Sequence, residues 1–95
     1  MMNEFQVGGY VNSIAGHDSG KCYVIFQIDH EYLYLVDGKI RTLDHPKKKK
    51  IKHVTMLAGA DPEIKEKILN HSIKNEEIKR TIKMLLNRKS SKEAK

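Results

Sequence analysis

The sequence contains one cysteine, two prolines and no tryptophan in 95 residues, and it has no long apolar run. The lone thiol, Cys22, cannot form an intramolecular disulfide, and its apolar neighbours indicate a buried structural cysteine. A membrane span needs about 18 apolar residues, and the start of the chain lacks the basic and apolar regions of a signal peptide. We therefore expect a cytoplasmic protein with one domain, because two independent cores need a longer chain.

The motifs of metal binding and catalysis are also missing. The five histidines form neither an HxH nor an HExxH pattern, and Cys22 has no second thiol to complete a zinc site. The pair His17-Asp18 has no nucleophile or phosphate-binding glycine motif around it. We expect a protein that is not an enzyme and that has no metal site, no cofactor and no small-molecule substrate.

The charge is strongly divided along the chain, although its sum is +6. Residues 1–46 carry three basic and six acidic side chains, whereas residues 47–95 carry fifteen basic and six acidic ones. The two parts therefore have net charges of −3 and +9. Such a concentration of positive charge is typical of proteins that bind nucleic acid or another anionic surface.

Alternating apolar residues predict a mainly β first part. We expect strands over residues 5–14, 21–29, 32–36, 39–43 and 47–55. The pair Gly8-Gly9 indicates a bend in the first strand. In the second, Cys22, Val24, Phe26 and Ile28 alternate onto one face. The dipeptide Asp37-Gly38 predicts a two-residue type I′ hairpin turn, across which residues 39–43 pair back.

Two helices are predicted after residue 60. Asp61 followed by Pro62 is a helix start, and residues 70–74 interrupt the pattern. A second helix opens at Asn75, and its apolar residues recur at helical spacing, namely Ile78, Ile82, Leu85 and Leu86. We expect a barrel over residues 1–57, a two-helix extension packed on it over residues 58–89, and a flexible polar tail over residues 90–95.

The run Lys47–Lys50, with Lys52, is the strongest electrostatic feature. On an extended strand its ammonium groups alternate between two faces, where they could neutralise phosphates with little sequence discrimination. The alternative is that the run only improves solubility. The aromatic residues could stack on unpaired bases or pack in the core, and Tyr10, beside the double glycine, is our candidate for stacking.

The order of these motifs resembles the KOW-containing SH3-like domain of the large-subunit ribosomal protein of the fourteen-e type. The resemblance covers residues 5–57. It rests on Val7-Gly8-Gly9-Tyr10-Val11, the loop Gly16 to Gly20, Asp29-His30-Glu31, Leu35-Val36-Asp37-Gly38 and the basic segment 47–53. It implies a small SH3-like β-barrel of about five strands followed by two helices.

The resemblance also implies a non-catalytic, RNA-binding ribonucleoprotein component. Its partner would be ribosomal or other structured RNA, with ribosomal proteins as possible further partners and no membrane. We expect RNA contacts from Lys47, Lys48, Lys49, Lys50, Lys52, His53, Gly16, His17, Gly20, Lys21, Tyr10, Lys39 and Arg41. The alternatives are a protein–protein interaction module of the translation or transcription machinery, whose acidic first part faces a basic partner, and, more remotely, a membrane-surface helix over residues 74–95.

Overall fold

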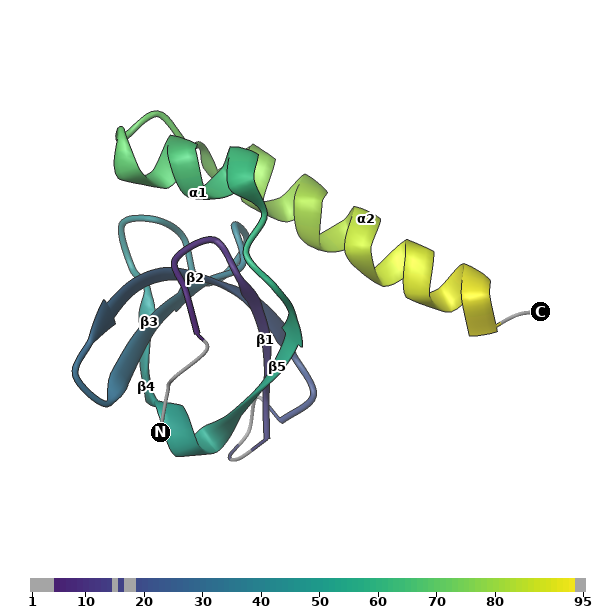
Figure 1. Ribbon diagram of the computed structural model, residues 1–95, viewed down its shortest axis with the longest axis horizontal. Coiled ribbons are helices and arrows are strands. Elements are labelled where there is room, and N and C mark those ends of the chain that lie inside the picture. Colours follow the sequence, from purple (N-terminus) through teal and green to yellow (C-terminus); the bar gives the residue numbers. More distant parts are fainter. Residues whose placement is uncertain (1–4, 15, 17–18, 94–95) are drawn as a thin grey trace.

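The computed structural model of the 95-residue chain describes residues 5–14, 16 and 19–93, with side chains up to residue 88. It contains a five-stranded antiparallel sheet followed by two helices, which confirms a mainly β fold with a C-terminal α part (Figure 1). The elements are β1 (Tyr10–Ser13), β2 (Cys22–Asp29), β3 (Tyr32–Val36), β4 (Lys47–Lys50), the 3₁₀ turn η2 (Ile51–His53), β5 (Val54–Ala58), α1 (Pro62–Leu69) and α2 (Asn75–Glu93).

The strands lie in the order β4-β3-β2-β1-β5, so β4 and β5 form the two edges of the sheet as described. Figure 1 shows the sheet strongly curved around a common interior, with η2 leading from one edge strand to the other. The predicted strand over residues 47–55 is therefore divided by η2. The chain must turn there because β4 pairs with β3, whereas β5 pairs with β1.

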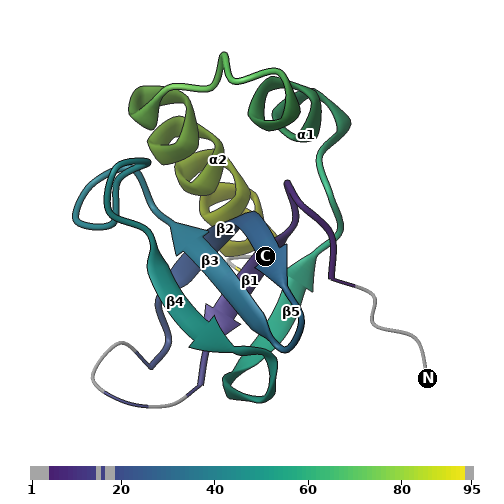
Figure 2. The same cartoon turned by 90° about the vertical axis from the view of Figure 1, so that its left-hand side faces the viewer.

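Apolar side chains fill both sides of the sheet. The concave side holds Val11, Tyr23, Ile25, Leu33, Leu35 and Val54. The other side packs against the helices, and its cluster includes Tyr10, Val24, Val36, Ile64, Ile68, Ile73, Ile78 and Ile82. Figures 1 and 2 show both helices over this same side of the sheet. Burial on both sides explains why residues 22–26 read as an almost continuous apolar run.

Two irregularities change the predicted strands. The first strand begins only at Tyr10, because the chain bends at the glycine pair, where the Gly8 N–H donates to Ile25 O at 2.9 Å. In β2 the pairing register shifts between Ile25 and Gln27. The alternation therefore reverses, and Ile28 packs in the concave core rather than on the helix side with Cys22. A one-residue slip moves every later side chain to the opposite face.

The predicted type I′ hairpin at Asp37-Gly38 is wrong, as is a strand over residues 39–43. Residues 37–46 form a loop, and β3 pairs instead with β4, with Leu35 opposite Lys47. The Asp37 carboxylate accepts from the backbone N–H groups of Lys39 and Arg41, both at 2.9 Å. A side chain that binds its own backbone in this way competes with strand pairing.

The helix predictions are confirmed at the start of α1, where Asp61 Oδ1 accepts from the N–H groups of Glu63 and Ile64. Residues 70–74 separate the helices, and α2 begins at Asn75. The Lys67 ammonium bonds the Glu77 carboxylate and so ties α1 to α2. Helix α2 continues to Glu93, so residues 90–93 of the expected tail are helical. Its C-terminal part runs past the sheet (Figure 1).

Candidate nucleic-acid interface

Strand β4 presents its four lysines alternately to two surfaces. Lys48 lies opposite Tyr34, and Lys50 lies opposite Tyr32. The Lys48 ammonium is 4.5 Å from the centre of the Tyr32 ring, and that of Lys50 is 5.9 Å away. Both distances allow a cation–π contact. We call this set of Tyr32, Tyr34, Lys48 and Lys50 the aromatic face.

The other two lysines of the strand, Lys47 and Lys49, lie opposite the buried Leu35 and Leu33. Lys47 and Lys49 line a hollow of about 340 Å³ at this edge of the sheet. We call it the basic hollow, and its described lining is Gly16, Lys21, Tyr23, Asp37, Ile40, Arg41, Lys47 and Lys49.

Three distant parts of the chain supply the charge of the basic hollow. Lys21 precedes β2, Arg41 lies in the 37–46 loop, and Lys47 and Lys49 come from β4. The acid in the described lining is Asp37, whose carboxylate already accepts two backbone N–H groups. Among the described lining residues there are four cations and one acid, which favours a local positive potential that attracts anions.

The structure brings five of the predicted contact residues together in this hollow: Gly16, Lys21, Arg41, Lys47 and Lys49. Other predicted residues lie elsewhere. Lys52 is exposed and His53 is half-buried in η2, outside the hollow lining. Gly20 and Lys39 line a neighbouring groove beside α2, which shares Lys21 with the hollow. His17 is outside the described residues.

Tyr10 lies in the core and not on the surface. It is only 5% exposed, and its hydroxyl bonds the Thr81 hydroxyl on α2 and lies 3.5 Å from Asp61 Oδ2. Burial raises the pKa of this phenol above its ordinary value. The Tyr10 ring cannot stack on an RNA base unless α2 moves away, so the predicted stacking role of Tyr10 is wrong. Tyr32 and Tyr34, both half-buried on the aromatic face, are the better-placed aromatic residues.

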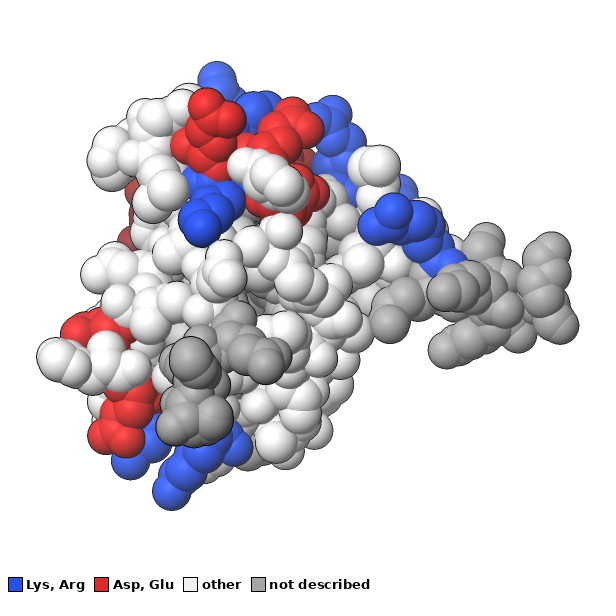
Figure 3. Space-filling view, viewed as in Figure 1, with Lys and Arg blue, Asp and Glu red and all other residues white. Residues whose placement is uncertain are grey.

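Two lysines on α2 were not among the predicted contact residues. Lys79 and Lys83 are one helical turn apart and line the same groove as Lys21 and Lys39. Their spacing of four residues was a usable signal, because such residues share one helix face. On the side of the molecule drawn in Figure 3, basic side chains gather near the lower end of the sheet and again along the helical layer.

The remaining titratable groups form no second centre among the described residues. Burial raises the pKa of the Cys22 thiol to about 11, so this cysteine stays protonated at neutral pH. The described part of the chain holds no cluster of three or more His, Cys, Asp or Glu side chains suited to a metal ion. Within the same part, neither helix combines the length and apolar character needed to cross a membrane.

The chain matches no model of a known protein family, and a search of curated proteins finds no match.

Proposed function

We propose that this chain is a non-catalytic RNA-binding protein that associates with the ribosome or with other structured RNA. We further propose that its sheet is an SH3-like barrel of the KOW type. The curved five-stranded sheet, which encloses an apolar core on its concave side, supports this assignment.

The observation that carries the proposal is the convergence of Lys21, Arg41, Lys47 and Lys49 around one hollow. Each cation that meets a phosphate releases counterions from the nucleic acid, which favours binding. Arg41 adds a planar guanidinium that can hold two phosphate oxygens at once. A phosphodiester backbone passing this edge of the sheet would therefore meet several cations at once.

The aromatic face supports RNA rather than a simple anion as the ligand. Tyr32 and Tyr34 stand next to Lys48 and Lys50 on the opposite surface of the same strand pair. A protein that binds single-stranded or looped RNA combines basic side chains along the backbone with aromatic rings under unpaired bases. We therefore propose that the RNA crosses the β3–β4 edge, with phosphates at the basic hollow and an unpaired base on the aromatic face.

The test is a fluorescence-anisotropy titration of a labelled RNA hairpin, with an unpaired loop, at several salt concentrations. If about five cations meet phosphates, log K should fall with log salt with a slope of about −3 to −4. The double variant Lys47→Gln/Lys49→Gln should weaken binding and make the slope shallower by about 1.5. Crosslinking in cells, followed by sequencing of the bound RNA, would then identify the target.

A matched control is Lys74→Gln/Arg80→Gln, which removes the same charge from exposed positions near or on α2. It should leave the slope unchanged. A flat salt dependence of the unaltered protein, or equal losses of affinity in the two double variants, would refute the proposal.

A further inference from the structure

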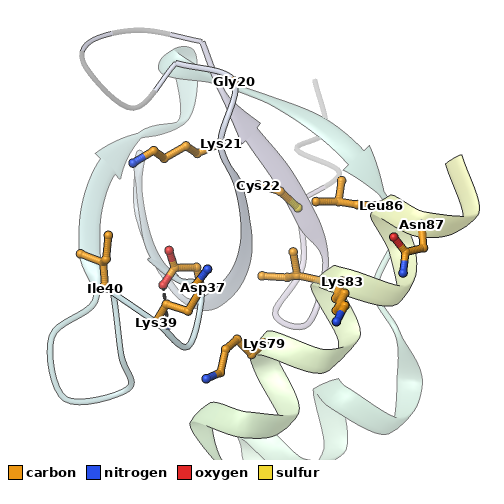
Figure 4. A pocket seen from close by; sticks show the side chains of 11 residues that line it. Gly20, Lys21, Cys22, Asp37, Lys39, Ile40, Lys79, Lys83, Leu86 and Asn87 are labelled. Carbon is orange, nitrogen blue, oxygen red and sulfur yellow. Dashed lines mark hydrogen bonds between the residues drawn. The ribbon is translucent and has the colours of Figure 1, made fainter. Parts of the chain in front are cut away.

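A groove of about 670 Å³ runs between α2, the 37–40 segment and the start of β2. This volume is within the range of about 300–1,000 Å³ that is usual for binding pockets. Figure 4 shows the groove with α2 side chains on one wall and Lys21, Cys22 and Ile40 coming from the sheet and the loop.

The inner surface of the groove is apolar. Cys22 and Leu86 approach from opposite walls, and Ile82, which also lines the groove, belongs to the helix-side core. Ile40 is 72% exposed at the edge, and Leu86 is 44% exposed. Isoleucine and leucine side chains exposed beside a cavity, within a polar surround, are typical of a site that another molecule covers.

The rim of the groove is positive. Lys21 and Lys39 come from the sheet side, and Lys79 and Lys83 come from α2. The acid in the described lining is Asp37, and its carboxylate is held by backbone N–H groups of its own loop. The groove therefore selects a ligand that is negative at its edges and apolar at its centre.

RNA satisfies only half of this requirement. Phosphates could meet the lysines, but the described lining offers no aromatic ring on which a base could stack. A protein segment with acidic residues beside leucine-like ones satisfies both halves. We propose that the groove binds an acidic amphipathic helix of a partner protein. The groove adjoins the RNA site on β4, and Lys21, Asp37 and Ile40 line both.

The geometry of α2 suits such a partner. Its first part is anchored in the core through Ile78, whereas its later part leaves Leu86, which lines the groove, 44% exposed. A partner helix could lie along this projecting part and insert apolar side chains at intervals of three or four residues. This partner has the opposite charge to the one that the acidic first part of the sequence suggested.

The test uses labelled synthetic peptides of about five helical turns, titrated against the full chain at physiological salt. One carries leucine and glutamate on opposite helix faces, one has the same residues in shuffled order, and one replaces glutamate by lysine. We expect the acidic amphipathic peptide to bind at least about tenfold more tightly than the other two. Equal binding of the shuffled peptide would overturn the proposal.

Two double variants with equal charge changes separate this groove from the RNA site. Lys79→Glu/Lys83→Glu should lower peptide affinity about tenfold or more, whereas Lys48→Glu/Lys50→Glu should change it by less than about twofold. RNA affinity should show the reverse order. Ile40→Ser is a further variant, because its exposed side chain contributes little to folding. This substitution should also weaken binding of the peptide. Equal losses of peptide affinity in both double variants would refute a protein site in this groove.

Discussion

Gly38 is the point at which the 37–46 loop meets the start of α2, and its substitution tests why the predicted hairpin does not form. Its φ is +80°, which L side chains rarely adopt. A Cβ at this position would lie 2.4 Å from Asn75 O, 2.9 Å from Lys79 N and 3.3 Å from Ile78 Cβ. Two of these three atoms belong to the α2 backbone, so they cannot rotate away as a flexible side chain would.

The expected cost of Gly38→Ala follows from two terms. The left-handed backbone costs about 1–2 kcal/mol for a residue with a Cβ, and forcing an atom into a packed contact adds about 1–3 kcal/mol. We therefore expect the free energy of unfolding to fall by about 2–5 kcal/mol, from a total of about 5–15 kcal/mol for a domain of this size.

Gly20→Ala is the matched control. Gly20 has a similar φ of +88°, but a Cβ there meets no described atom within 4 Å. Only the backbone term applies, so its expected loss is about 1–2 kcal/mol. In a domain of this size, each kcal/mol of difference lowers Tm by about 4–8 °C.

The measurement is urea denaturation followed by circular dichroism, with a thermal scan of the same three proteins. Gly38→Ala should be clearly less stable than Gly20→Ala. Equal losses would refute the packing argument, because a solvent-exposed type I′ turn at Asp37-Gly38 would predict the backbone term alone.

Two further substitutions test contacts that α2 makes with the sheet and with the segment before it. Tyr10→Phe removes the hydroxyl that bonds Thr81 and should lower the free energy of unfolding by about 1 kcal/mol without changing RNA affinity. Weaker RNA binding at unchanged stability would contradict the place of Tyr10 in the core. Hydrogen bonds from the Lys67 ammonium and the Lys74 N–H hold the pKa of Glu77 below its ordinary value of 4.5. The contribution of the Glu77 carboxylate to stability is therefore present above pH 4.5, and it is lost as the pH falls through the lower pKa of Glu77 in the folded protein. The stability difference between the unaltered protein and Glu77→Gln, measured by urea denaturation from pH 7 to pH 3, should therefore shrink on acidification, and a difference that stayed constant would exclude this origin.

The sequence by itself determined the elements whose signals are local. Asp61 and Pro62 mark the start of α1 because an N-cap carboxylate and a proline act on the first helical turn alone. The period of Ile78 and Ile82 identifies the buried face of α2 in the same way. The sequence alone also showed the run of apolar and aromatic residues that forms β3 and the division of charge at residue 46.

Tertiary structure decided where these parts meet, because contacts between distant segments leave no fixed spacing in the sequence. Tyr10 is buried rather than exposed because α2 covers it with Thr81, which is 71 residues further along the chain. Residues 37–46 form a loop rather than a hairpin because Gly38 and Leu43 are held by α2, Leu43 through a 2.8 Å bond from its N–H to Asn75 Oδ1. The pairing of β3 with β4 divides the lysine run between two surfaces and brings Lys47 and Lys49 to the hollow that Lys21 and Arg41 also line.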